Sequence, residues 1–206
     1  MHIPQHNNNN QAIVDCNNDI VPLCYFNIIK LKAGESYTYQ LADYETCIVP
    51  ATGSIDVEVQ GETFKEVGKR QHIWEGDPEG VYVPVSSEAK LTCISNEVEV
   101  FISGAKHNEA YEAFVIRQED IDKVQYGSDE TKTHRKIKHI LGKDPAGKVG
   151  KLLVSYWLVS YLQWVKEDGQ DSLLINMKQI CFQKKVATMK FTILDLTLQM
   201  VLALSF

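Results

Sequence analysis

Three residues in one basic segment of this 206-residue sequence have side chains that could bind an anionic ligand: His134, Arg135 and His139. Their imidazole and guanidinium groups can carry positive charge and donate hydrogen bonds to a carboxylate. The surrounding residues alternate between charged and apolar types, which is also typical of the solvated face of a linker. We therefore take these three residues as substrate-binding candidates, with the solvated linker face as the simpler alternative.

Two other polar groups have simple structural interpretations. Glu75, Asp77 and Glu79 surround a Gly and a Pro, so we interpret them as a carboxylate-rich turn rather than an acidic site. His72 has no partner at metal-ligand spacing within the strand that we predict over residues 72–74, and we interpret it as a structural or surface residue. The sequence contains no Ser/His/Asp set, phosphate-binding loop or CxxC pair that would indicate another chemistry.

Composition narrows the partners and the compartment. Lys and Arg number 21 against 27 Asp and Glu, and the net charge of −6 is spread along the chain, so we expect neither nucleic acid nor a membrane as partner. The amino terminus lacks a basic and an apolar signal region, and we expect a cytoplasmic protein. Five cysteines without a CxxC pair indicate reduced thiols, mostly buried and structural: Cys16, Cys24, Cys47, Cys93 and Cys181.

The elements that must position these residues are predicted to be β-strands. Short apolar runs divided by Gly, Pro, Asp and Ser fill residues 25–102, which is the pattern of an antiparallel sandwich or barrel. Residues 25–31 and 36–41 flank a turn at Gly34 and are predicted to form a hairpin. Residues 55–59 alternate strictly between apolar and acidic types, which predicts a strand with one wet face that turns at Gln60–Gly61.

The chain divides into four predicted parts. Residues 1–24 form an arm, 25–118 a first barrel, 119–155 a linker with the opening strand of a second barrel, and 156–206 a tail of different character. Residues 117–124 are predicted to be a helical turn or connector, and 149–155 a strand. In the tail Gly169 is the only Gly or Pro, and neither strand alternation nor a helical stripe persists, so segments 180–185 and 188–206 would continue a jelly roll poorly.

Several segments resemble a known enzyme family. Residues 28–37 (IIKLKAGESY), 47–49 (CIV) and 52–55 (TGSI), followed by 74–76 (WEG) and 81–84 (VYVP), resemble the amino-terminal half of bacterial 5-deoxy-glucuronate isomerases of myo-inositol catabolism. Residues 133–141 and 151–154 keep the same order and spacing, so the resemblance covers about residues 25–155. Related ketol isomerases that act on deoxy-hexuronates in pectin breakdown share the architecture and are the alternative.

The resemblance implies a bicupin whose second barrel holds a divalent metal and the chemistry. Its metal motif is a Pro-Pro-His-Lys-His segment with acidic residues and a later His. Imidazoles two residues apart on a strand point to the same side, which suits a metal site with nitrogen and oxygen ligands. This sequence has no His after His139, so it lacks the motif, and we predict no metal site and no metal for this chain.

A shifted reading frame could explain the tail. Taking the third base of each codon with the next two bases, residues 164–183 can encode a segment that contains Pro-Pro-His-Lys-His, and residues 189–205 a second segment that resembles the family. We therefore predict a frameshift close to Ser155, in the gene or in its sequencing.

The sequence thus predicts an all-β fold, a cupin-type jelly-roll barrel that is the amino-terminal half of a bicupin with an incomplete second barrel. By resemblance, the function is aldose–ketose isomerisation of 5-deoxy-glucuronate to 5-dehydro-2-deoxy-gluconate, with a small sugar acid as the partner and a divalent metal in the intact family. We predict that this particular chain is inactive. The alternative from another class is a non-catalytic cupin module that binds a ligand with residues 25–118. The sequence leaves the oligomeric state open.

Overall fold

The structure is a computed structural model. It describes residues 7–17, 19–73, 75–128, 130 and 135–159, together with the backbone of β13 (Trp164–Glu167), β14 (Gln170–Leu173), β15 (Asn176–Lys185) and β16 (Thr188–Asp195). Side chains are described up to Ser155, with that of Arg135 outside the description. None of the helices in this part of the chain is long and apolar enough to cross a membrane.

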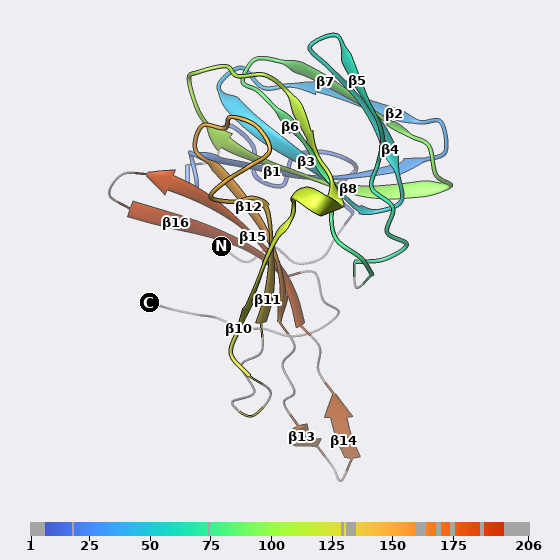
Figure 1. Cartoon of the computed structure of the whole chain (residues 1–206), viewed down its shortest axis with the longest axis vertical. Helices are drawn as coiled ribbons and strands as arrows, with labels where there is room; N and C mark the ends of the chain where they lie inside the picture. Colours follow the sequence, from blue (N-terminus) through green and yellow to red (C-terminus); the bar gives the residue numbers. More distant parts are fainter. Residues whose placement is uncertain are drawn as a thin grey trace.

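The first barrel consists of two facing antiparallel sheets (Figure 1). One sheet has the order β1-β8-β3-β6-β9: β1 (Cys24–Lys32), β8 (Glu97–Lys106), β3 (Tyr44–Thr52), β6 (Gly80–Val83) and β9 (Phe114–Ile116). The other has the order β2-β7-β4-β5: β2 (Ser36–Gln40), β7 (Glu88–Cys93), β4 (Ile55–Val59) and β5 (Glu62–Val67). This arrangement confirms the predicted all-β, cupin-type fold.

The core of the barrel lies between the two sheets. Ile29 and Ile48 of the β1-β8-β3-β6-β9 sheet and Val57 and Leu91 of the β2-β7-β4-β5 sheet belong to one buried cluster and are 0% exposed. In β4 the alternating pattern has the predicted result, because Ile55, Val57 and Val59 are buried while the acidic residues between them face outward. The strand turns into β5 at Gln60–Gly61, where both residues have positive φ angles, as predicted.

The predicted hairpin of residues 25–31 and 36–41 is wrong. Gly34 does form a turn with a φ of 79°, and the backbone N–H of Glu35 donates to the carbonyl of Lys32. However, β1 pairs with β8 and β2 pairs with β7, so the turn carries the chain from one sheet to the other. Both strands have an apolar face that must reach the same core, and placing them in opposite sheets buries both faces.

The strand predicted over residues 72–74 is also wrong. His72 and Ile73 lie in a bend of the loop between β5 and β6, and Trp74 lies outside the described residues. His72 is at the surface, as interpreted, with its Nε2 atom 3.0 Å from a carboxylate oxygen of Glu75. Gly68 and Gly76, which lie on either side of this segment, have positive φ angles that bend the chain away from an extended strand.

The described part of the amino-terminal arm packs along β1. The side chain of Asn8 donates to Asn27 Oδ1 and to the carbonyl of Ile28, both at 2.9 Å. Val14 is 0% exposed and bridges Phe26. The arm therefore lies against β1, which is an edge strand of its sheet.

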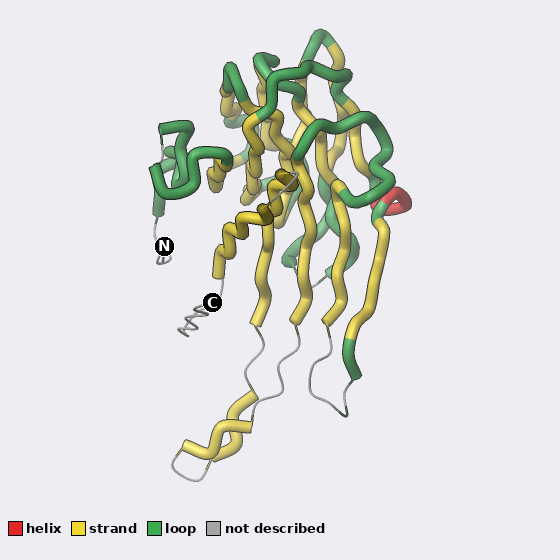
Figure 2. Tube along the Cα trace, turned by 90° about the vertical axis from the view of Figure 1, so that its left-hand side faces the viewer, coloured by secondary structure: helices red, strands yellow, loops and turns green. Residues whose placement is uncertain are grey.

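Another sheet, β10-β11-β12-β15-β16, extends from the barrel (Figure 2). We call it the second sheet, to distinguish it from the two barrel sheets. A 3₁₀ turn over Gln118–Asp120 leads into it, so the helical turn predicted over residues 117–124 is present in its first part, whereas residues 122–124 already belong to β10. The sheet begins with β10 (Asp122–Tyr126), β11 (Arg135–Leu141) and β12 (Leu152–Val159), so part of the predicted linker is a hairpin and the opening strand of the second unit starts at Leu152. Figure 1 shows these strands running away from the barrel, with β13 and β14 at the far end.

Residues 180–185 and 188–206 were expected to continue a jelly roll poorly, yet the backbones of 180–185 and 188–195 join this sheet within β15 and β16, and residues 196–206 lie outside the described residues. Ladder hydrogen bonds use backbone groups that every residue except proline carries, so a strand can pair without a matching side-chain pattern. The side chains of the tail lie outside the described residues, and the frameshift and the four-part division stay predictions.

The second sheet covers the outer face of the first barrel sheet. Residues of β3 alternate between the barrel core and a second cluster, in which Cys47 and Val49 pack with Ile140, Leu152 and Val154. Both faces of β3 are therefore buried. Cys24, Cys47 and Cys93 are buried thiols as predicted, whereas Cys16 is exposed and the side chain of Cys181 is not described.

Candidate functional site

Of the three predicted substrate-binding residues, the structure places one side chain. His139 lies on β11, opposite Ser155 of β12, and its Nδ1 atom is 2.7 Å from the Ser155 hydroxyl. Ser155 is 3% exposed, so its hydroxyl is held within the sheet, and the contact with this hydroxyl orients the His139 imidazole. Arg135 begins β11, but its side chain is not described, and His134 lies outside the described residues. The structure therefore does not test whether the three residues form one site.

A metal does not fit the residues whose side chains the structure describes. No group of three or more His, Cys, Asp or Glu side chains among them has an arrangement that could hold a metal ion. The His139–Ser155 pair supplies one imidazole and one hydroxyl, fewer ligands than a stable divalent site requires.

A buried carboxylate joins the second sheet to the barrel. Glu45 of β3 is 0% exposed and accepts four hydrogen bonds. Its Oε2 atom accepts from the hydroxyl of Tyr82 at 2.7 Å and from the backbone N–H of Gly150 at 2.8 Å. Its Oε1 atom accepts from the backbone N–H groups of Lys151 and Leu152, the latter at 2.8 Å. Three successive N–H groups at the start of β12 are thus satisfied by one side chain.

Tyr82 is suited to remain a donor to this carboxylate. Burial raises the pKa of its hydroxyl, and the adjacent Glu45 raises that pKa further. The hydroxyl therefore keeps its proton across the physiological range. We call Glu45, Tyr82 and the N–H groups of residues 150–152 the Glu45 anchor.

The acidic turn predicted from the sequence makes a second connection between the two units. Asp77 lies 2.6 Å from Lys123 Nζ of β10 and 2.8 Å from Lys138 Nζ of β11. Lys138 also donates to the carbonyl of Gly76 at 2.6 Å. Partial burial favours the neutral acid, but hydrogen bonds from the two lysines outweigh it and lower the pKa of Asp77. The structural interpretation of this turn is confirmed for Asp77.

Asp77→Asn should therefore weaken the protein at neutral pH and have little effect in acid. A lowered native pKa stabilises the fold above the ordinary value of 3.8, and this stabilisation is lost as the pH falls through the native pKa. We expect the variant to lose about 1–2 kcal/mol of unfolding free energy at pH 7 and a much smaller amount near pH 3. Urea unfolding at both values measures this, with Asp43→Asn as the control because Asp43 forms a 3.9 Å surface pair. A pH-independent loss would contradict the assignment.

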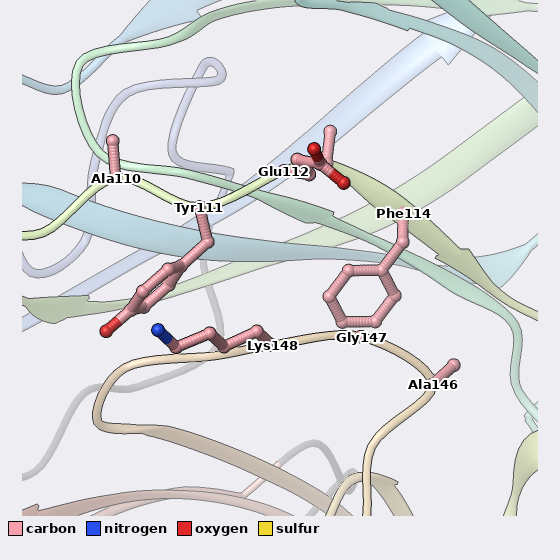
Figure 3. A pocket seen from close by; sticks show the side chains of 8 residues that line it. Ala110, Tyr111, Glu112, Phe114, Ala146, Gly147 and Lys148 are labelled. Carbon is pink, nitrogen blue, oxygen red and sulfur yellow. The ribbon is translucent and has the colours of Figure 1, made fainter.

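A hollow of about 540 Å³ lies where the segment before β9 meets the loop before β12 (Figure 3). Its walls are Tyr111 and Phe114 on one side and Lys148 on the other, and the remainder is lined by the acidic Glu112 and by four small residues: Ala110, Ala113, Ala146 and Gly147. The ammonium of Lys148 is 4.4 Å from the centroid of the Tyr111 ring, which is cation–π geometry.

Rings and glycines hold the two walls together. Phe114 stacks on Tyr82 with centroids 5.1 Å apart, and its other side meets Gly147 so closely that a Cβ there would overlap the ring. Gly150 lies against the His107 ring in the same way. The Tyr111 hydroxyl donates to Glu109 at 2.7 Å, and this bond raises the pKa of Tyr111 and lowers that of Glu109. The Tyr111 ring is thus held at the rim of the hollow.

Neither the Glu45 anchor nor the hollow was predicted from the sequence. The anchor had one local signal, because Glu45 directly precedes the apolar run of residues 46–49 and a carboxylate in a buried strand needs partners. The hollow had none, since its walls come from segments that are separate in sequence.

Comparison with known proteins gives a consistent result. A sequence model of the KduI/IolB family matches residues 1–164. A 5-deoxy-glucuronate isomerase of Listeria innocua is 28% identical over 145 residues, which cover 69% of this chain and 52% of that protein. A Bacillus subtilis protein of the same name is 35% identical over 72 residues, 34% of this chain and 27% of that one. The chain spans about half the length, or less, of these relatives.

Among solved structures, the fold matches an IolB-like protein from Salmonella typhimurium. The TM-score is 0.66 at 24% sequence identity, and the match covers 73% of this chain and 55% of the other. At this identity the likeness shows the fold alone.

Proposed function

This chain belongs to the KduI/IolB family, and we propose that it carries the amino-terminal barrel of an aldose–ketose isomerase that acts on 5-deoxy-glucuronate. The observation that supports this most is the family match itself, because it runs through the barrel and on into β12. The substrate class, a small sugar acid, follows from the name of the relatives. A cytoplasmic location and the role in inositol breakdown are parts of the same proposal.

The proposed reaction moves a proton between adjacent carbons and needs a base and an electrophile at the carbonyl. A divalent metal would supply the electrophile in the intact family. The described residues do not fit a metal, and the family's Pro-Pro-His-Lys-His segment is missing from this sequence, so we derive no step through it. What this chain supplies is a scaffold, in which the Glu45 anchor fixes the start of β12 and so the strand that carries Ser155.

We therefore expect no isomerase activity from this chain alone. The purified chain, incubated with 5-deoxy-glucuronate and with Zn²⁺, Mn²⁺ or Mg²⁺ in turn, should leave the aldose signals in the proton NMR spectrum unchanged. The Bacillus subtilis relative, assayed in parallel, is the positive control. Turnover by the chain, or one equivalent of metal retained after dialysis and measured by plasma mass spectrometry, would contradict this expectation.

The predicted frameshift accounts for the missing motif and is tested separately. Sequencing the DNA from the codon of Lys151 onward should reveal a base gained or lost near Ser155, after which the frame encodes His-Lys-His. A confirmed frame as printed would leave a chain without the motif. In that case the alternative, a non-catalytic cupin module that binds a ligand, would be better supported than an isomerase of 5-deoxy-glucuronate. It would also be better supported than a deoxy-hexuronate isomerase of pectin breakdown.

A further inference from the structure

The second sheet ends in an edge strand, β10, whose outer side pairs with no strand in the part of the chain that the structure describes. β10 pairs with β11 along its inner side, and the order of the sheet gives it no neighbour on the other. Figure 2 shows it at the outer side of the sheet, directly below the 3₁₀ turn. An open edge presents backbone N–H and C=O groups that can pair with another strand.

Two edges of the first barrel show how this chain closes such strands elsewhere. The amino-terminal arm covers β1, where the side chain of Asn10 accepts the backbone N–H of Lys30 at 2.8 Å and donates to its carbonyl at 3.1 Å. β5 has a bulge in its pairing with β4, and Glu66 has a φ angle of 53°. The carbonyl of Glu66 accepts from the Arg117 guanidinium at 3.0 Å, so a further strand would find this group occupied.

β10 itself lacks the features that protect an edge strand. Its ladder with β11 is regular, and its sequence, DKVQY, contains no proline. Its one lysine, Lys123, lies 2.6 Å from a carboxylate oxygen of Asp77, so the charge that would repel another strand is compensated within the chain. Tyr126, at the end of β10, is 52% exposed. The strand is therefore accessible both along its backbone and at its largest side chain.

The sequence of β10 is complementary to a second copy of itself. Identical edge strands pair antiparallel about a two-fold axis perpendicular to the sheet, which places one residue opposite its own copy. With Val124 on the axis, all five residues of β10 are paired. Asp122 then lies opposite Tyr126 of the second copy, whose hydroxyl can donate to the carboxylate, and Lys123 lies opposite Gln125, whose amide oxygen can accept. An axis at Lys123 would instead bring two lysines together.

We infer that two copies of this chain form a two-fold dimer through β10, with Val124 on the axis, so that the second sheet continues from one copy into the other. The interface consists of one short strand from each copy, and a contact of this size gives a weak dimer with a dissociation constant of about 10–100 µM. The dimer uses surface residues and backbone groups alone, so the inference is independent of the proposed isomerase reaction.

The test is sedimentation equilibrium of the full chain over a series of concentrations, which should show a monomer–dimer equilibrium. Gln125→Glu should tighten the dimer by about three- to tenfold, because it places a carboxylate opposite Lys123 of the second copy, twice by symmetry. Gln125→Lys should weaken the dimer by about the same factor or more, because two lysines then meet at each of these positions. Both effects should shrink at high salt, since exposed charges are screened.

Gln40→Glu and Gln40→Lys are the matched controls. Gln40 is an exposed glutamine at the end of β2 in the first barrel, and its two variants change the net charge as the Gln125 variants do. They should leave the dissociation constant unchanged within about twofold. Gln125 is also exposed, so its variants should unfold at nearly the same urea concentration as the wild type.

Three outcomes would overturn the inference. The first is a chain that stays monomeric at all concentrations. The second is a dimer that both Gln125 variants leave unchanged, which would place the contact at another surface such as the edge at β16. The third is a dimer that both variants weaken equally, because the charge of residue 125 would then not face Lys123. No turnover is measured, so a failure of the proposed isomerase reaction would not affect this result.

Discussion

Glu45→Gln is expected to lower the free energy of unfolding by about 3–5 kcal/mol, the largest loss that we expect from a single polar substitution in this chain. The carboxylate is 0% exposed and accepts from Tyr82 and from three successive backbone N–H groups. A glutamine keeps one accepting oxygen and turns an NH₂ group toward donors, so some of these N–H groups would be buried without a partner.

The loss should be local as well as global. In hydrogen exchange, the amides of residues 150–152 should lose protection in Glu45→Gln, whereas those of β4 and β7 in the opposite barrel sheet should keep most of theirs. Glu58→Gln is the control, because Glu58 is half exposed and pairs with Lys90 at the surface, where a change within about 1 kcal/mol is expected. If Glu45→Gln were as mild as Glu58→Gln, the anchor would not hold the second sheet to the barrel.

Glu79→Gln is expected to cost about 2–4 kcal/mol of unfolding free energy, because Glu79 is the buried member of the acidic turn. It is 1% exposed, lies 3.1 Å from Arg117 Nη1 and accepts the backbone N–H of Gly68 at 3.0 Å. Arg117 in turn donates to the carbonyls of Lys65 and Glu66 at the end of β5. The pair therefore ties β5 to the point where the chain leaves the first barrel.

A double-mutant cycle with Arg117→Gln separates the pair from its surroundings. We expect a coupling energy above about 1 kcal/mol, because the Glu79 carboxylate is 1% exposed and the Arg117 side chain is partly buried at 27%. Glu75→Gln is the matched control from the same turn, since Glu75 is half exposed and contacts His72; its expected cost is below about 0.5 kcal/mol. Equal losses in the two variants, or a coupling energy near zero, would show that the ion pair does not contribute to the connection.

The acidic turn also shows how far spacing alone can predict a site. The residue types indicated a turn rich in carboxylates, and the structure agrees for Asp77 and Glu79. Spacing alone did not predict that the three carboxylates have different surroundings. Glu79 is buried against Arg117, Asp77 binds two lysines, and Glu75 faces solvent. Asp77 meets its two lysines only because β10 and β11 reach the turn, and Glu79 meets Arg117 only because the segment after β9 packs against it.

The sequence by itself determined the features that depend on neighbouring residues. The alternation of residues 55–59 set the buried and wet faces of β4, and Gln60–Gly61 set its turn, because side chains on a strand alternate with a period of two and a glycine adopts positive φ without strain. The family resemblance rested on such local segments too, and it agreed with the family match over residues 1–164.

Only the tertiary structure decided which segments meet. Gly34 predicted a turn, but the pairing of β1 with β8 and of β2 with β7 depended on a core that both strands must reach. Glu45 lies 105 residues before Gly150, and Tyr111 meets Lys148 only because the loop before β12 packs on the first barrel. Contacts of this kind depend on the packing of whole sheets, and no local pattern encodes them.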